Sequence, residues 1–187
     1  MKIALFGGTF DPVHHGHLIL AREARERLGL DRVVFIPAAQ SPFKPGIGSA
    51  PAALRLEMLN AAIEGEAGLE IDDSELTRGG TSYTIDTVLA AQSRWPGADL
   101  HWCIGGDHVR QLAAWHRYAE LRELVRFIVF ARAGGDASHG FPVIERQVDV
   151  SATDIRERVA QGVSIRYLVP GPVRTLIERH GLYRNSR

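Results

Sequence analysis

The stretch Ile3-Ala4-Leu5-Phe6-Gly7-Gly8 near the N-terminus decides the fold class. Its four apolar residues precede two glycines, which is typical of a buried strand that ends in a tight turn. An amphipathic helix is predicted over 18–28, because apolar residues recur there every four positions among charged ones. Gly29 ends this helix, and Val33-Val34-Phe35-Ile36 forms a second strand. A strand, a helix and a strand within about 35 residues predict a βαβ unit in a parallel sheet with a right-handed crossover.

The same alternation of patterns continues to the C-terminus. Further strands are expected over 69–71, 100–104, 127–130 and 143–150. Further helices are expected over 52–63, 83–94, about 107–115, 119–124, 151–161 and 172–180. No internal repeat, low-complexity tract or linker interrupts the pattern. We therefore expect an α/β fold: one doubly wound, parallel-sheet, Rossmann-like domain over 1–187, with a small C-terminal helical part over about 151–187.

Composition and charge limit the classes of partner. The 187 residues include 22 Lys and Arg against 22 Asp and Glu, which argues against broad binding of nucleic acid or of an anionic membrane. A single cysteine, Cys103, excludes a disulfide within the chain and a four-cysteine zinc site. The N-terminal apolar run is too short for a signal peptide, and no stretch approaches the ~18–20 apolar residues of a membrane span. We expect a soluble, cytoplasmic protein that binds small molecules.

Glycine is the one over-represented residue. The chain has 19 glycines, about a tenth of its length and above the usual ~7%. Three pairs, Gly7-Gly8, Gly105-Gly106 and Gly134-Gly135, each follow a predicted strand. Ligands of open parallel sheets bind outside the carboxyl ends of the strands, where glycine lets the backbone approach them. A short turn explains any one pair, but the set of three favours a ligand site.

The richest segment is Gly7-Gly8-Thr9-Phe10-Asp11-Pro12-Val13-His14-His15-Gly16-His17. It matches neither the dinucleotide-binding glycine fingerprint nor the P-loop. It places His14 and His17 at the start of a helix, whose free N–H groups favour anions, so both imidazoles could address one phosphate. Gly16 leaves the backbone between them bare. A zinc site formed by His14, His17 and Asp11 is the less favoured alternative, since the sequence displays no supporting second shell.

This segment resembles the nucleotidylyltransferase superfamily, whose hallmark is the motif HxGH. Within it, the form GGTFDPVHxGH is similar to the bacterial nicotinate-nucleotide adenylyltransferases. The resemblance runs from Lys2 to about Tyr183 and is weakest over 134–148. It implies transfer of AMP from ATP to nicotinate mononucleotide, which gives deamido-NAD and pyrophosphate. It also implies Mg²⁺ as cofactor, bound mainly through the ATP phosphates rather than by protein ligands.

A second segment, Val150-Ser151-Ala152-Thr153-Asp154-Ile155-Arg156, contains a helix start. A capping pair formed by Ser151 and Asp154 explains those two residues but leaves Arg156 unexplained. The segment resembles the family motif SxTxxR, which implies that Ser151, Thr153 and Arg156 hold the β- and γ-phosphates of ATP. The resemblance thus assigns catalysis to His14, His17 and Arg156. Further ATP contacts are implied for Gly7, Gly8, Thr9, Phe10, Gly16, Gly105 and Asp107.

Other stretches point to the second substrate. Ser82-Tyr83-Thr84-Ile85-Asp86-Thr87 resembles the family motif SYTxxT, which implies contacts of Tyr83 and Thr84 with the nicotinate side. An ordinary capped helix start is the alternative explanation. Asp107 and Trp115 match GxDxxxxxxxW, and Trp115 could stack on a pyridine ring or be an ordinary core tryptophan.

Two basic residues complete the expected acceptor site. Arg132 matches a family position near the nicotinate carboxylate, to which the guanidinium fork is suited. Lys44 matches a loop position near phosphate, although an exposed loop lysine is the default interpretation. Phe43 stands where the family often has histidine, and His116 stands where some members have tyrosine. Because of these departures, the sequence leaves open how the Lys44 loop contacts the substrate and which side chains form the edge of the pyridine pocket.

The implied reaction needs neither a general base nor a protein nucleophile, because the attacking phosphate is already anionic. Catalysis then consists of positioning and charge stabilisation, with at least one of His14 and His17 acting as an imidazolium. Two alternatives stay open: another acceptor, such as nicotinamide mononucleotide or phosphopantetheine, and a non-catalytic nucleotide sensor. The sequence leaves open whether the chain forms a homo-oligomer and how strictly it prefers the acid over the amide.

Overall fold

The core of the fold is a parallel sheet that is seen in a computed structural model describing residues 1–39, 50–131 and 139–184. Within these ranges six strands are paired in the order β3-β2-β1-β4-β5-β6, and every pair is parallel. The chain winds outward from β1 through β2 and β3, then returns to the other side through β4, β5 and β6. The doubly wound α/β prediction is thereby confirmed, with the switch point between β1 and β4. The strands are β1 (Lys2–Gly8), β2 (Arg32–Pro37), β3 (Leu69–Ile71), β4 (Asp99–Gly105), β5 (Arg126–Ala131) and β6 (Val143–Glu145).

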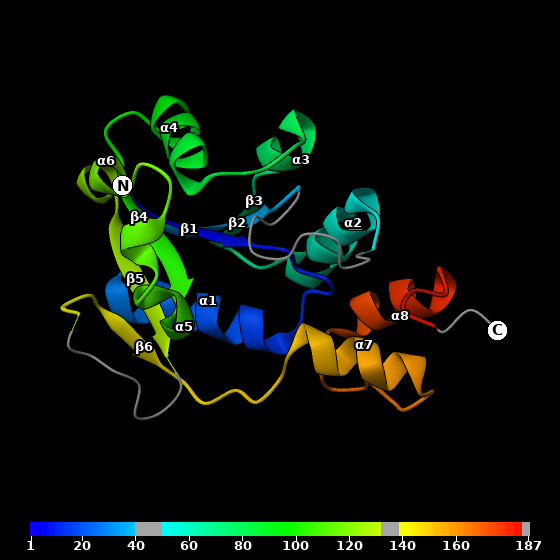
Figure 1. Cartoon of the computed structure of the whole chain (residues 1–187). Coiled ribbons are helices and arrows are strands. Elements are labelled where there is room, and N and C mark those ends of the chain that lie inside the picture. The colour runs from blue at the N-terminus through cyan, green and yellow to red at the C-terminus, as the bar shows by residue number, and fades with distance from the viewer. Residues whose placement is uncertain (40–49, 132–138, 185–187) are drawn as a thin grey trace.

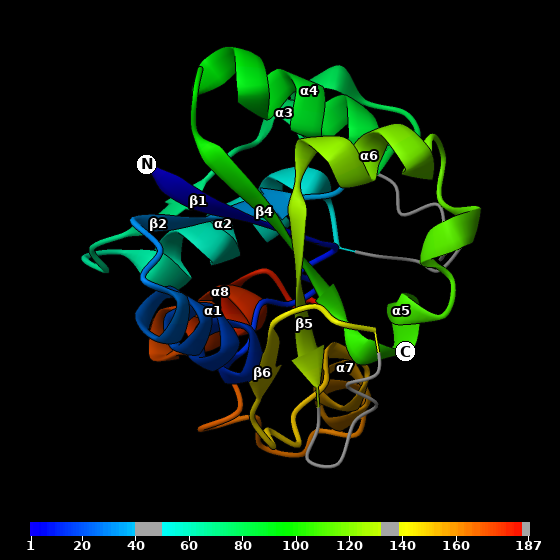
Figure 2. The same cartoon turned by 90° about the vertical axis from the view of Figure 1, so that its left-hand side faces the viewer.

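Helices cover both faces of the sheet (Figures 1 and 2). Side chains alternate along β1, so that Ala4 and Phe6 join one core cluster while Ile3 and Leu5 join the other. The first cluster includes residues of α1, α2 and α8, and the second includes residues of α4 and α6. The helices are α1 (His15–Leu28), α2 (Ala52–Ile63), α3 (Ser74–Arg78), α4 (Thr84–Arg94), α5 (Gly106–Val109), the 3₁₀ turn η1 (Leu112–Ala114), α6 (Tyr118–Leu124), α7 (Ala152–Ala160) and α8 (Gly171–Arg179).

Two local predictions are wrong, and one helix was not predicted. The strand expected over 143–150 ends at Glu145, because β5 ends at Ala131 and the last link is the bond from Arg146 N–H to the Ala131 carbonyl, at 3.2 Å. The helix expected over about 107–115 is split into α5 and η1. The short helix α3 was not expected, because five residues are too few for a periodic apolar pattern. None of the helices in the described parts of the chain combines the length and hydrophobicity needed to cross a membrane.

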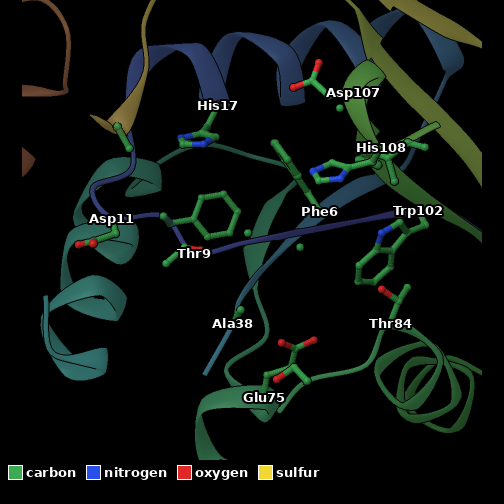
Figure 3. A pocket seen from close by; sticks show the side chains of 18 of the residues that line it. Phe6, Thr9, Asp11, His17, Ala38, Glu75, Thr84, Trp102, Asp107 and His108 are labelled. Atoms are coloured by element: carbon green, nitrogen blue, oxygen red, sulfur yellow. The ribbon is translucent and has the colours of Figure 1, made fainter. Parts of the chain in front are cut away.

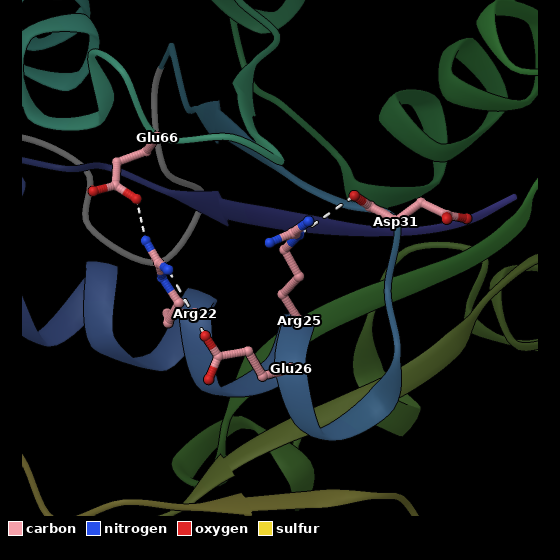
Figure 4. A network of polar contacts seen from close by, with 5 residues as sticks. All are labelled: Arg22, Arg25, Glu26, Asp31 and Glu66. Carbon is pink, nitrogen blue, oxygen red and sulfur yellow. Dashed lines mark hydrogen bonds and ion pairs between the residues drawn. The ribbon is translucent and has the colours of Figure 1, made fainter.

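A network of exposed polar contacts ties α1 to neighbouring loops (Figure 4). Arg22 pairs with Glu66, which lies between α2 and β3, and with Glu26 at 3.7 Å. Arg25 Nε donates to the Asp31 carbonyl at 3.4 Å. Exposed pairs of this kind contribute about 0–1 kcal/mol each, so this network does little to hold the fold.

Candidate active site

A cavity of about 1120 Å³ opens at the carboxyl ends of β1 and β4, beside the switch point of the sheet. Residues of the turn after β1 line it, together with the starts of α4, α5 and α7 (Figure 3). Two of the expected glycine pairs, Gly7-Gly8 and Gly105-Gly106, lie at this edge. The third pair, at 134–135, lies outside the described residues. The cavity exceeds the ~300–1,000 Å³ of an ordinary ligand pocket, so it has room for more than one small molecule.

The end of β1 is packed too closely for side chains at its last two residues, Gly7 and Gly8. A Cβ added to Gly7 would stand 2.7 Å from Trp102 Cζ2, and one added to Gly8 would stand 2.9 Å from the Phe10 ring. Phe10 itself adopts a left-handed conformation, with φ of 48°, which folds its ring back over the turn. These contacts explain why the sequence needs both glycines here, independently of any ligand.

His14 and His17 lie against each other at the start of α1. Their rings are stacked, with 3.7 Å between centroids and 25° between planes. The His14 backbone N–H donates to His17 Nδ1 at 3.2 Å, so a neutral His17 carries its proton on Nε2. A Cβ on Gly16 would stand 2.9 Å from His14 Nδ1, so a side chain there would displace the ring. Glycine at position 16 therefore leaves room for the two imidazoles to stack.

Both imidazoles have lowered pKa values in this arrangement. Burial, with a smaller contribution from the His15 charge, lowers the pKa of His14 from 6.5 to about 4. Burial and the neighbouring His14 lower the pKa of His17 well below its ordinary value. Burial therefore opposes charging of the pair in the absence of ligand, and the expected imidazolium stays a prediction for the complex with ATP, whose phosphate charge favours it. His17 keeps one hydrogen-bond donor, Nε2–H.

Acidification is expected to destabilise the fold in a defined pH window. The unfolded chain takes up the His14 proton near pH 6.5, whereas the folded chain does so only near pH 4, so stability is full above 6.5 and is lost as pH falls between these values. Between about pH 7 and pH 5 the loss from this one group is on the order of 2 kcal/mol. Urea unfolding at several pH values measures it. His14→Gln should flatten the curve, and an unchanged slope in that variant would refute the assignment.

The start of α7 meets the turn after β1 although 145 positions separate the contacting residues. Ser151 Oγ accepts from the Asp154 N–H at 3.1 Å, as the capping pattern predicts. Arg156 Nη1 donates to the Asp11 carbonyl at 2.7 Å, and its Nη2 donates to Thr153 Oγ1 at 3.3 Å. Ser151, Thr153 and Arg156 line the same cavity as the two histidines. The two motifs thus form one site.

Asp11 is a buried anchor rather than a partner of the imidazoles. Its Oδ1 accepts from the Ala50 N–H at 3.1 Å and from the Tyr183 hydroxyl at 2.6 Å. The described residues contain no trio of histidine, cysteine or acidic side chains placed to hold a metal ion. The geometry therefore does not support a zinc site formed by Asp11, His14 and His17.

Arg55 is a positioning residue behind the cavity wall that the sequence analysis missed. It lies on α2 with 2% of its surface exposed. Its guanidinium donates to three carbonyls from three segments: Thr9 at 2.7 Å, Ala38 at 2.9 Å and Ala50 at 3.3 Å. A signal was available, because Arg55 lies three positions before the apolar Met58 on the buried side of the predicted helix.

The other end of the cavity carries the expected acceptor residues. Tyr83 and Thr84 line it from the start of α4. Asp107, which was expected to contact ATP, lines the cavity from the first turn of α5 on the side of His17 (Figure 3). Trp115 lines it as well and is half-buried, 6.4 Å from the Phe127 ring between centroids. It is thus neither a fully buried core residue nor a surface one. The His116 ring packs against Tyr83, with 4.5 Å between centroids.

Three residues named in the sequence analysis have no described position, and one residue of the cavity was not expected. Lys44, Phe43 and Arg132 lie outside the described residues. Glu75, on the unexpected helix α3, lines the cavity with 4% of its surface exposed. Nothing in the sequence pattern marked it, because it is one acidic residue in a short polar stretch.

Relatives with similar sequences are found over the whole chain. The sequence model of the cytidylyltransferase-like family matches residues 5–158. A protein of Gemmatimonas aurantiaca is 45% identical over 197 residues, which cover 98% of this chain and 93% of that protein. A protein of Opitutus terrae is 41% identical, and the alignment covers 100% of both chains. Both relatives carry the name "Probable nicotinate-nucleotide adenylyltransferase".

Solved structures share the fold. The Plasmodium falciparum nicotinic acid mononucleotide adenylyltransferase complexed with NaAD matches with a TM-score of 0.81 and 16% identity, covering 97% of each chain. The same protein complexed with APC matches with a TM-score of 0.79, covering 97% of this chain and 96% of that one. The sequence relatives match at nearly full length and the family model spans most of the chain. The chain therefore belongs to the cytidylyltransferase-like family and, within it, to the nicotinate-nucleotide adenylyltransferases.

Proposed function

We propose that this protein transfers AMP from ATP to the 5′-phosphate of nicotinate mononucleotide, in NAD biosynthesis. A phosphate oxygen of the acceptor attacks the α-phosphorus of ATP. The bond from that phosphorus to the oxygen bridging to the β-phosphate breaks, and pyrophosphate leaves with the electron pair. The observation that carries the proposal is that both signature motifs line one cavity with room for two ligands. The names of the full-length relatives support the same reaction.

The proposal assigns the α-phosphate to the two histidines. His17 donates from Nε2 to a phosphate oxygen. The ring of His14, which lies at the start of α1, stacks against His17 and supports it. The phosphate charge favours protonation of the pair and so opposes the effect of burial on their pKa values. Arg156, Ser151 and Thr153 hold the β- and γ-phosphates and stabilise the departing pyrophosphate. The remaining ATP contacts are assigned to Gly7, Gly8, Thr9, Phe10, Gly16, Gly105 and Asp107.

No covalent enzyme intermediate is part of the proposed reaction. Cys103 lines the cavity from β4, but burial raises the pKa of its thiol, so the sulfur stays protonated and weakly nucleophilic. The acceptor phosphate needs no base because it is already an anion. Positioning and charge stabilisation are then sufficient for the chemistry.

Mg²⁺ fits this site as a partner of ATP. The described residues hold no ready-made metal trio, and Mg²⁺ in nucleotide sites is commonly carried by substrate phosphates with water. Bound there, the ion would neutralise charge on the β- and γ-phosphates. Arg156 would supply the protein's share of that neutralisation.

The acceptor is assigned to the end of the cavity lined by Tyr83, Thr84 and Trp115. Lys44 and Arg132 are assigned to its phosphate and carboxylate by the family resemblance alone. The proposal treats 1–187 as one domain whose C-terminal helical part begins at about 151. Val173 of α8 supports this, because it belongs to the same core cluster as strand β1. We place the protein in the cytoplasm, with small molecules as its partners.

Side-by-side turnover of different acceptors tests the function. Pyrophosphate release is measured with ATP, Mg²⁺ and one of nicotinate mononucleotide, nicotinamide mononucleotide or phosphopantetheine. The fastest release is expected with nicotinate mononucleotide, and none without an acceptor. Faster release with phosphopantetheine would refute the acceptor assignment, and no release with any acceptor would favour a nucleotide sensor.

A further inference from the structure

Glu75 places a buried acidic group at the acceptor end of a cavity meant for anions. It lies on α3, follows the end of β3 and has 4% of its surface exposed. Figure 3 shows its carboxylate pointing into the cavity near Thr84, with His17 on the opposite side. Phosphates and carboxylates are repelled by such a group, so its presence needs a reason.

The carboxylate is held in place from α4. Thr87 Oγ1 donates to Glu75 Oε1 at 2.5 Å, and Arg78 Nη2 donates to the same hydroxyl at 3.4 Å. Burial raises the pKa of Glu75, while the Thr87 hydrogen bond and the Arg78 charge act in the opposite direction. The Asp72 charge adds to the effect of burial. A positive group in the cavity would favour the ionised form further.

Only one group in the two proposed substrates is a cation. The phosphates of both substrates and the nicotinate carboxylate are anions, and adenine is neutral. The pyridine ring of the mononucleotide is positive, because its nitrogen is bonded to the ribose. We propose that Glu75 is a specificity-determining residue that binds the cationic pyridinium ring of the acceptor. This inference rests on the proposed function and deepens its acceptor site.

The proposal separates two tasks within that site. Glu75 selects for the charged ring that the acid and the amide acceptors share. Preference between acid and amide then depends on other groups near the ring substituent. An indole face can also attract a cation, so Trp115 is the competing source of ring selectivity.

A neutral-ring isostere of the acceptor provides the test. In 3-carboxyphenyl riboside 5′-phosphate a carbon replaces the ring nitrogen, which removes the positive charge and preserves the shape. Wild-type protein should bind nicotinate mononucleotide about 10- to 100-fold more tightly than this compound in calorimetry, as expected for a charge pair in a site of low dielectric. Equal affinities for the two compounds would overturn the proposal without any variant.

Glu75→Gln then identifies the source of the preference. Its amide oxygen can still accept from Thr87, so the change removes the charge and keeps this hydrogen bond. The affinity for nicotinate mononucleotide should fall about 10- to 100-fold, and that for the phenyl compound should change less than about threefold. Thr87→Val, which loses the hydrogen bond and keeps the charge, should retain most of the preference.

The outcomes separate this inference from the function on which it rests. If Glu75→Gln lowered the affinity for both compounds equally, Glu75 would have a merely structural role. If the variant kept the full preference for the charged ring, that preference would come from Trp115. Either result overturns the proposal. Failure of wild-type protein to release pyrophosphate from ATP and nicotinate mononucleotide refutes the proposed function instead.

Discussion

Replacing His17 with alanine is expected to lower kcat about 10²- to 10³-fold and to leave the protein folded. The imidazole is held by the His14 N–H at Nδ1, so its Nε2–H remains for the α-phosphate. A donor fixed in this way needs no reorganisation when charge develops on the phosphate, and for this reason its loss costs rate. The fold loses one hydrogen bond, from the His14 backbone N–H to the His17 side chain at the start of α1, which is worth about 1 kcal/mol. Pyrophosphate release and urea unfolding measure the two effects.

His15→Ala is the matched control for this variant. His15 is the neighbouring histidine of α1, but it does not line the cavity, and its backbone N–H bonds to the Leu168 carbonyl whatever its side chain. Its kcat should stay within about threefold of wild type, since its side chain does not line the cavity and contributes only the smaller part of the shift in the His14 pKa. Wild-type turnover in His17→Ala, or an equal loss in His15→Ala, would remove His17 from the catalytic assignment.

The fold was largely predictable because its signals are local. The helix α2 and the strand β3 begin and end at the predicted residues. Gly29 ends α1 in the left-handed conformation expected of a glycine at a helix C-terminus. The parallel, doubly wound sheet followed from the βαβ rule, whereas the order of its strands was not predicted. What failed was set by tertiary contacts: the length of β6 depends on where β5 ends, and a five-residue helix such as α3 has no periodicity of its own.

The candidate site was predictable only where a motif names its residues. His14, His17 and Arg156 are brought together as the motifs suggest. Their protonation was not predictable, because it depends on the ring stacking and burial that the fold creates. Tyr183 was missed as a partner of Asp11, since 172 positions separate the two and nothing local in the sequence connects them. Glu75 was missed for the same reason, whereas Arg55 had a signal in its place on the buried side of the predicted helix, three positions before Met58.

Arg55→Met is expected to destabilise the protein by about 3 kcal/mol. Methionine fills most of the space of the arginine stem but leaves the carbonyls of Thr9, Ala38 and Ala50 without their donor. Each buried carbonyl left unsatisfied costs about 1–3 kcal/mol, and relaxation or water recovers part of that sum. Activity should also fall, because Thr9 and Ala38 line the cavity and lose the group that fixes them. Urea unfolding at neutral pH gives the stability, and steady-state kinetics give kcat and KM.

Two variants show whether the arginine acts through its geometry. Arg55→Lys keeps the charge, but one ammonium group cannot reach three carbonyls as the planar fork does, so most of the loss should remain. Arg22→Ala removes an exposed arginine from the ion pairs of α1 and should change stability by less than about 1 kcal/mol, with activity unaffected. If Arg55→Met were as stable as Arg22→Ala, the three carbonyls would not depend on the guanidinium. If lysine restored full stability, charge rather than the fork would hold the segments together. We expect Arg55→Met and Arg55→Lys both to be much less stable than Arg22→Ala. This result requires a buried arginine that joins the turn after β1 to the segment after β2 and the start of α2.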